Sequence, residues 1–334
     1  RLLLWEARRR PVLLWLDDVQ WSESTVEFAE LLLDEPLRHP VLIVATARTE
    51  AGAEPWSSRL SEGLSRGHLA VPPLARSAQA DLLASLIGLA PRVSAEVLRR
   101  TEGRPLYATQ ILSDWVGRDV LRPTPDGYTV PDAELALPES VQTLQTRRLD
   151  RVLDALDDLD GLAAVEIAAA LGRSVSQAEW EAACAAADTA VAPTLVGALT
   201  DHALAQPMLQ GWRFTHNVLR DAIERRALDA GRWPRWNAAI VDSLAPGLDL
   251  EAAAPLERLA RHAFAAERAD AGLSWLEAAA RALRRRGSYD RAAALLAEHA
   301  TIREERGYGP RAPASLTARA IAARIAAARG QYDA

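Results

Sequence analysis

The stretch that decides the fold is Pro11-Val-Leu-Leu-Trp-Leu-Asp17-Asp18, an apolar run that ends in two carboxylates. A second apolar run, Val41-Leu-Ile-Val-Ala-Thr46-Ala-Arg48, also ends in polar residues. Apolar runs without alternation are typical of strands that are covered on both faces of a parallel sheet. A leucine-rich helical segment separates the two runs, so the order strand, helix, strand predicts a βαβ unit with a right-handed crossover.

Polar side chains follow both predicted strands at their carboxyl ends, which is the edge where open parallel sheets bind ligands. At this edge Asp17 is placed to hold Mg²⁺, and Asp18 is placed to orient an attacking water. Thr46 lies at the same edge, and the guanidinium of Arg48 suits a γ-phosphate. The alternatives are two aspartates that only begin a loop and an Arg48 in a surface salt bridge. Because the second strand also ends in polar residues, the pattern favours a nucleoside-triphosphate site.

The phosphate-binding half of such a site is missing from the sequence. All 39 basic residues other than histidine are arginine, whereas a Walker A loop (G-x-x-x-x-G-K-[ST]) requires a lysine. The chain has no initiator methionine and begins one short helix before the first strand. We therefore expect a fragment of a longer protein, with the Walker A loop upstream.

Composition narrows the class of protein. A length of 334 residues predicts two or three domains. A net charge of −6 gives no large basic surface for nucleic acid. The single cysteine, Cys184, excludes an internal disulfide and indicates a reducing, cytoplasmic location. The sequence shows no signal peptide and no apolar run near the ~18 residues of a membrane span.

Sequence patterns divide the chain into four parts. Residues 1–72 form the partial α/β core, and a short strand and turn are predicted at Leu69–Leu74. Residues 73–136 are helical, with a hairpin that turns at Asp126-Gly127. Residues 137–230 combine helices with a second small hairpin, which is consistent with a winged-helix-like module. Residues 231–334 are alanine-rich helices.

An internal repeat marks the last part. Arg286-Gly-Ser-Tyr-Asp290 recurs as Arg329-Gly-Gln-Tyr-Asp333, and each copy follows a helix rich in alanine and arginine. This pattern predicts stacked helix–turn–helix units. A Gly/Pro-rich insertion at Gly307–Pro313 would lengthen a tetratricopeptide (TPR) unit to the spacing between the two copies, from Arg286 to Arg329.

Taken in order, the motifs resemble those of the bacterial STAND ATPases, which are signal-transduction ATPases with numerous domains, related to AAA ATPases and found in LuxR-, SARP- and maltose-regulator-type transcription regulators. The matching segments are Leu14-Trp-Leu-Asp-Asp-Val-Gln-Trp21 (Walker B), Val44-Ala-Thr-Ala-Arg48 (sensor 1), Thr101-Glu-Gly-Arg-Pro-Leu-Tyr107 (the lid motif E-G-x-P), Arg148-Leu-Asp150 and Trp212-Arg-Phe-Thr-His216 (winged helix), and Gly287-x-Tyr289-x-x-Ala292 (helical-repeat arm). The resemblance implies a mixed fold: a partial α/β P-loop NTPase core with a parallel sheet, a helical lid, a winged-helix-like module and an all-α TPR-like arm.

The resemblance also implies ligands. ATP or ADP with Mg²⁺ would bind between core, lid and winged helix, with Gly103 and Pro105 near the adenine and His216 sensing a phosphate. The alternatives are a plain helix break at Gly103-Arg-Pro105 and a core or capping role for His216. The family often has an acid after this histidine, where the chain has Asn217.

The function implied by the resemblance is a slow, Mg²⁺-dependent ATPase switch in the parent chain, with this fragment inactive alone. Exchange of ADP for ATP, together with an inducer or protein partner on the helical arm, would release oligomerisation and control transcription or another effector. A rival interpretation is a non-catalytic scaffold that displays helical repeats. A third, direct DNA reading through Val218–Ala227, ranks last because that helix mixes arginines with acids. No membrane association is expected.

Overall fold

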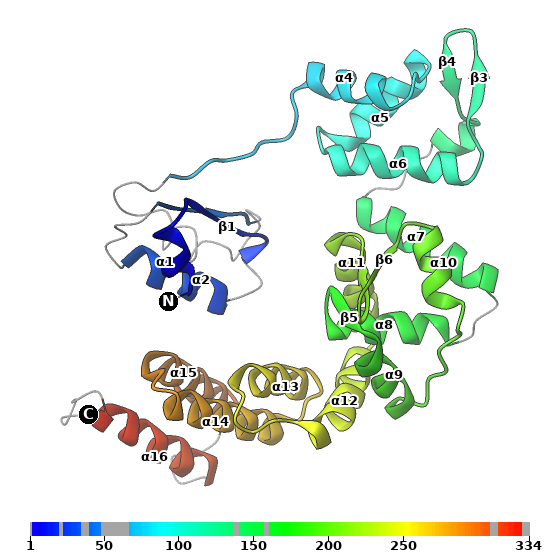
Figure 1. Ribbon diagram of the computed structural model, residues 1–334. Coiled ribbons are helices and arrows are strands. Elements are labelled where there is room, and N and C mark those ends of the chain that lie inside the picture. The colour runs from blue at the N-terminus through cyan, green and yellow to red at the C-terminus, as the bar shows by residue number, and fades with distance from the viewer. Residues whose placement is uncertain are drawn as a thin grey trace. The chain divides into compact units, whose positions relative to one another are not determined.

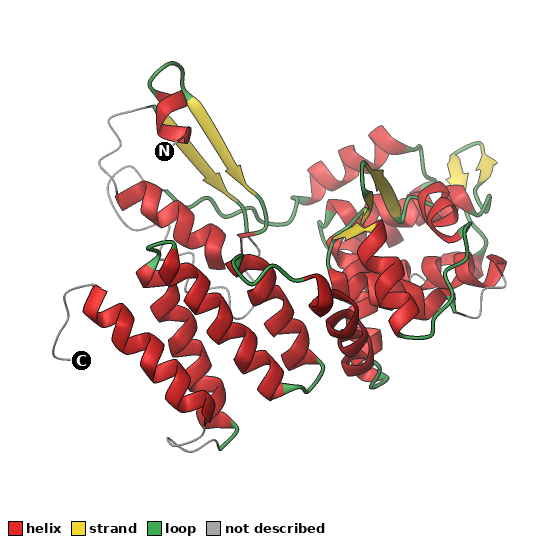
Figure 2. Ribbon diagram, turned by 60° about the horizontal axis from the view of Figure 1, so that its bottom comes forward, coloured by secondary structure: helices red, strands yellow, loops and turns green. Residues whose placement is uncertain are grey.

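The computed structural model describes residues 2–19, 23–34, 40–47, 67–135, 140–156, 160–307 and 313–328. The chain divides into two compact units, Arg1–Pro73 and Leu74–Ala334. The fold is mixed: it is mostly helical, with three small sheets among the described residues (Figures 1 and 2). Each unit is described below by itself.

The first unit contains the predicted βαβ unit. Its described elements are α1 (Leu2–Ala7), β1 (Val12–Leu16), α2 (Glu23–Asp34) and β2 (Val41–Ala45). Strands β1 and β2 pair in parallel, from Val12 opposite Val41 to Leu16 opposite Ala45. The prediction of two parallel strands joined by a helix is therefore confirmed.

The prediction that both faces of this sheet are covered is wrong for the described chain. Leu13 and Trp15 of β1 are 63% and 68% exposed. Their cross-strand partners on β2, Leu42 and Val44, are exposed as well. The alternate residues on the other face are half-buried. A continuous apolar run shows that a strand can be buried on both faces, but the run does not show what covers each face.

The predicted strand at Leu69–Leu74 is also absent. Residues 67–75 run without helix or strand, and Leu69 and Val71 are almost fully exposed. Pro72 and Pro73 have no N–H to donate to a ladder. Apolar residues in this stretch therefore cannot be taken as evidence for a strand.

The second unit begins with a three-helix bundle and a hairpin. The elements are α4 (Arg76–Leu86), α5 (Pro91–Thr101), α6 (Pro105–Gly117), β3 (Arg122–Thr124), β4 (Gly127–Thr129) and the 3₁₀ helix η2 (Asp132–Leu135). We call this segment the α4–α6 bundle. Val97, Ile111 and Trp115 are at most 1% exposed and form the centre of its core.

The hairpin is present, with its loop one residue earlier than predicted. Thr124 pairs with Gly127, so Pro125 and Asp126 form the two-residue loop. Gly127 has φ +118°, and a Cβ there would lie 2.7 Å from the carbonyl oxygen of Gly88. This position therefore needs glycine both for its backbone and for the close approach.

Residues 140–244 form the middle module. Its elements are α7 (Val141–Leu156), α8 (Gly161–Leu171), β5 (Ser174–Ser176), α9 (Gln177–Ala186), α10 (Leu195–Asp201), β6 (Ala205–Met208), β7 (Gly211–Phe214), α11 (Asn217–Asp229) and α12 (Trp233–Leu244). The antiparallel sheet has the order β5-β7-β6. Trp212 meets Trp180 and Phe214 edge-on, with ring centroids 5.3 and 4.9 Å apart, and all three rings are buried.

Two elements of the middle module are missing from the sequence interpretation. The strand β5 and the helix α9 were not predicted. The helix predicted over Leu195–Leu204 does precede the β6–β7 hairpin, as α10, and the segment Val218–Ala227, which was considered for direct DNA reading, lies in α11 after the hairpin. In a helix-turn-helix arrangement the helix that precedes the wing occupies the recognition position, and α10 carries no basic residue.

A fully buried carboxylate joins α12 to the other helices of the middle module. Glu166 on α8 accepts two hydrogen bonds from Arg232, at 2.6 and 2.9 Å, and one from Trp236 Nε1 at 2.8 Å. Trp236 belongs to the same apolar core as α8 and α9. The core therefore extends one helix beyond the predicted boundary at residue 230.

The helical arm comprises η3 (Ala245–Gly247), α13 (Ala253–Ala265), α14 (Ala269–Arg285), α15 (Tyr289–Glu305) and α16 (Pro313–Ala328). Figures 1 and 2 show the four α-helices side by side. Gly287, with φ +78°, makes the turn between α14 and α15. This turn is the first copy of the sequence repeat, and the second copy lies outside the described residues. Nowhere in the described ranges is a helix both long enough and apolar enough to cross a membrane.

A buried histidine at the start of the arm predicts acid sensitivity. His262 is 8% exposed, and its Nδ1 lies 2.8 Å from Asn237 Oδ1. Burial, reinforced by Arg258 and Arg261, lowers the pKa of His262 from 6.5 to about 4. Because the unfolded chain then binds the proton more readily, the free energy of unfolding should fall as the pH drops from about 6.5 to about 4, by up to ~3 kcal/mol.

Urea unfolding at pH 7 and pH 5, with hydrogen exchange in α12 and α13 as the probe, measures this change in the free energy of unfolding. His262→Gln should flatten the pH dependence, whereas the matched substitution His202→Gln, at an exposed histidine, should leave it unchanged. An equally steep profile in His262→Gln would refute the assignment.

Candidate functional site

Three of the four polar residues predicted at the sheet edge, Asp17, Asp18 and Thr46, meet there. The hydroxyl of Thr46 donates to Asp17 Oδ1 at 2.6 Å and accepts from the backbone N–H of Asp18 at 3.0 Å. Backbone hydrogen bonds of 2.9 Å from Thr46 to Leu16 and from Val19 to Thr46 continue the parallel ladder past the strand ends. Thr46 is thus the residue that fixes the two aspartates against β2.

The backbone at Asp18 is unusual. Asp18 has φ +55°, a left-handed conformation that aspartate adopts more readily than most residues. The chain therefore turns sharply directly after Asp17, whose side chain is exposed. A carboxylate on a fixed turn at the carboxyl end of a strand has the chemistry that Mg²⁺ prefers.

The carboxylate of Asp17 fits Mg²⁺ only if phosphate oxygens and water supply the other ligands. Within the described ranges, no group of three or more His, Cys, Asp or Glu side chains could hold a metal. Mg²⁺ in nucleotide sites is bound by one or two carboxylates and completed by phosphate oxygens and water. The hydrogen bond from Thr46 uses Oδ1 of Asp17, and among the described residues no hydrogen bond to Oδ2 competes with this role.

Gly103 and Pro105 form the break between α5 and α6. Glu102 and Gly103 have φ +49° and +79°, and Pro105 occupies the first turn of α6, where its missing N–H costs nothing. The segment lines a cavity of about 10 Å³, room for about one water molecule. The described conformation therefore explains the helix break and holds no space for an adenine ring inside this cavity.

His216 lies against the lid helix predicted from the sequence. It precedes α11, and its Nε2 is 3.3 Å from Gln110 Nε2 on α6. Gln110 Oε1 also accepts from Gln145 and Arg148 on α7, each at 2.5 Å. Residues from α6, α7 and the start of α11 thus converge on one amide. We call this group the Gln110 cluster: Gln110, Gln145, Arg148 and His216.

Positive charge dominates the Gln110 cluster. The hydrogen bonds of the Arg148 guanidinium go to neutral carbonyl oxygens, Gln110 Oε1 at 2.5 Å and His202 O at 2.8 Å. Burial lowers the pKa of Arg148. Burial also lowers the pKa of His216 below its usual 6.5, and the positive charges of Arg173 and Arg148 lower it further. An anion that entered here would find a guanidinium without a carboxylate in its hydrogen bonds, and its negative charge would favour protonation of His216.

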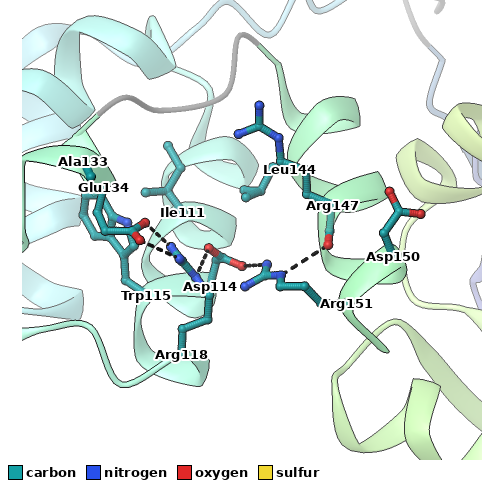
Figure 3. A pocket seen from close by; sticks show the side chains of 10 residues that line it. All are labelled: Ile111, Asp114, Trp115, Arg118, Ala133, Glu134, Leu144, Arg147, Asp150 and Arg151. Atoms are coloured by element: carbon teal, nitrogen blue, oxygen red, sulfur yellow. Dashed lines mark hydrogen bonds and ion pairs between the residues drawn. The ribbon is translucent and has the colours of Figure 1, made fainter. Parts of the chain in front are cut away.

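A cavity of about 420 Å³ lies between α6, η2 and α7 (Figure 3). Asp114, only 7% exposed, pairs with Arg118 at 2.9 Å and with Arg151. Arg118 also holds Glu134 at 2.6 Å. The junction between the α4–α6 bundle and α7 is therefore held by ion pairs as well as by apolar side chains.

The two halves of the predicted site belong to different units. Asp17, Asp18 and Thr46 lie in the first unit, whereas Gly103, Pro105 and His216 lie in the second. Arg48 lies outside the described residues. Sequence reasoning did not assign Gln110, which sits in no motif, and it used Arg148 only as part of a motif.

Searches for relatives add no identification. No protein-family model matches the chain. No curated protein matches it at a significant level.

Proposed function

We propose that the chain is part of a nucleotide-dependent regulatory switch of the STAND type, which binds ATP or ADP with Mg²⁺. The observation that carries this proposal is the hydrogen-bonded group Asp17–Thr46–Asp18 at the carboxyl ends of two parallel strands. The proposal requires a Walker A lysine from outside the printed sequence, since the chain contains none.

Within this proposal, each residue has a chemical task. Asp17 holds Mg²⁺, which supplies charge neutralisation for the phosphates when it is bound. Thr46 fixes the carboxylate of Asp17 and the backbone of Asp18, so that Asp18 can orient a water. His216 and Arg148 bind a phosphate oxygen at the start of α11, and Gly103 and Pro105 shape the turn that leads into the lid helix.

The regulatory part of the proposal rests on the Gln110 cluster. Arg148 and His216 contact Gln110 in the described state, so a phosphate that binds them competes with a contact between α6 and the middle module. Nucleotide would thereby shift the population of two arrangements of lid and winged-helix-like module. The arm, a TPR-like stack, would receive the inducer or protein partner, and the effector would be transcription or another output in the cytoplasm.

The rival function is a non-catalytic interaction scaffold. The uncovered sheet face of the first unit and the stacked arm helices are the observations that favour it. Nucleotide binding separates the two functions, because the scaffold predicts none.

The pH dependence of ADP binding tests the role of His216. Burial and nearby arginines hold the pKa of His216 below 6.5 in the absence of an anion, and a bound phosphate would raise it. Binding would then take up a proton, so the affinity for Mg·ADP should rise as the pH falls from about 8 to about 6. Isothermal titration in two buffers of different ionisation enthalpy measures the proton uptake.

His216→Gln should reduce this proton uptake and weaken ADP binding by about tenfold, which corresponds to ~1.4 kcal/mol. The control is His68→Gln, at an exposed histidine in the stretch 67–75, which has no helix or strand. Protonation of the phosphate itself also contributes to the proton uptake. The measured quantity is therefore the difference in proton uptake between the wild type and His216→Gln. No difference between them would remove His216 from the proposed site.

A further inference from the structure

A groove on the helical arm combines unpaired positive charge with apolar surface. It lies between α14 and α16 and encloses about 410 Å³. Its lining residues are Arg281, Arg284, Leu316, Ala320, Ile321 and Arg324, together with Thr317. The groove lies in the second unit and involves none of the residues assigned to the nucleotide.

The charge of the groove is opposite to that of the chain. The chain carries a net charge of −6, yet α16 contains no acidic residue. Arg281 pairs with Glu277 on its own helix at 3.0 Å. Among the described residues, the side chains of Arg284 and Arg324 form no ion pair or hydrogen bond, so two guanidinium groups face the groove without partners. Guanidinium groups of this kind bind carboxylates in a bidentate manner.

The apolar part of the groove and its length favour a peptide. Leu316 is 53% exposed, although it lies beside the buried Ile321. The lining residues of α16 extend from Leu316 to Arg324, which is about 12 Å along the helix axis at 1.5 Å per residue. An extended peptide rises about 3.3 Å per residue, so about four peptide residues would span this length.

We propose that this groove binds an acidic peptide segment, in which Asp or Glu side chains pair with Arg284 and Arg324 and an apolar side chain packs on Leu316. The inference specifies the partner that the proposed function assigns to the arm. Peptide binding can be measured without nucleotide, so failure of this inference and failure of the nucleotide proposal are distinguishable.

Fluorescence anisotropy with the full chain provides the test. The probe is a labelled twelve-residue peptide of Asp, Glu and Leu, and a second peptide has Asn and Gln in place of the acids. The wild type should bind the acidic peptide at least about tenfold more tightly than the neutral one. The double substitution Arg284→Glu with Arg324→Glu should lower the affinity for the acidic peptide by at least about tenfold.

The matched control is Arg319→Glu, on the exposed surface of α16 outside the groove. It should change the affinity by less than about twofold, as expected for a rim charge. The milder pair Arg284→Gln with Arg324→Gln, checked for unchanged helicity, guards against a folding defect. Hydrogen exchange should show protection by the peptide in α14 and α16.

Several outcomes would overturn the inference. An equal loss of affinity in Arg319→Glu would mean non-specific attraction, and tight binding of citrate or anionic lipid vesicles with no preference for the peptide would mean a different occupant. Equal affinity for the acidic and neutral peptides, or no binding by the wild type, would remove the site.

Discussion

Replacement of Asp17 by alanine should abolish Mg²⁺-dependent nucleotide hydrolysis in the polypeptide that joins this sequence to a Walker A loop. The carboxylate of Asp17 is exposed at the end of β1 and fixed by Thr46 at 2.6 Å, and it is the residue that the proposal assigns to the metal. The expected loss is at least about a hundredfold, equivalent to ~2.7 kcal/mol of transition-state stabilisation. Steady-state phosphate release with varied Mg²⁺ measures it.

Two further substitutions make this result specific. Asp18→Asn should lower kcat and leave Mg·ADP binding nearly unchanged, because Asp18 is assigned to the water and not to the metal. Asp81→Ala, at an exposed aspartate of α4, should have no effect. Turnover that survives in Asp17→Ala would show that the metal is held elsewhere.

The largest expected effect on stability is at Glu166. This carboxylate is 0% exposed and accepts three hydrogen bonds, two from Arg232 and one from Trp236. Glu166→Ala would leave the indole N–H buried without a partner and the guanidinium without its counter-ion. Breaking a buried pair costs about 3–5 kcal/mol. Because the Arg232 side chain is 37% exposed and can be hydrated, we expect a loss of ~3 kcal/mol in the free energy of unfolding.

Hydrogen exchange in α8 and α12 should report this loss locally, since a multidomain chain need not unfold in one step. Glu166→Gln should cost less, because an amide oxygen still accepts from Trp236. The control Glu181→Ala, at an exposed glutamate of α9, should change stability by less than about 0.5 kcal/mol. Unchanged exchange in Glu166→Ala would mean that the buried pair contributes nothing to the module.

The sequence predicted the elements whose patterns are long enough to read. The apolar runs gave β1 and β2 and their parallel pairing, and helical spacing with Gly and Pro breaks located α4, α5 and α6. Strand β5 is only three residues long, Ser174–Ser176, with a single buried side chain, so no period exists to detect. The exposed face of the first sheet was missed because the apolar pattern of a strand does not show which helix or strand packs against it.

The candidate site also contains residues that could be predicted from the sequence and residues that could not. Asp17, Asp18 and Thr46 were predicted because parallel strands end at a common edge, a rule that needs only the strand positions. The contact between Gln110 and His216 joins residues 106 positions apart and depends on how α6 packs on the middle module. A single sequence carries no local signal for such a contact.

The most direct test of the proposed nucleotide site is hydrogen exchange with and without Mg·ADP, on the longest natural polypeptide that contains this sequence. The proposal predicts slower exchange at residues 16–19 and 45–47, and also at residues 105–110 and 216–220, with little change in α15. Protection confined to the arm, or no protection at any of these segments at saturating nucleotide, would contradict it.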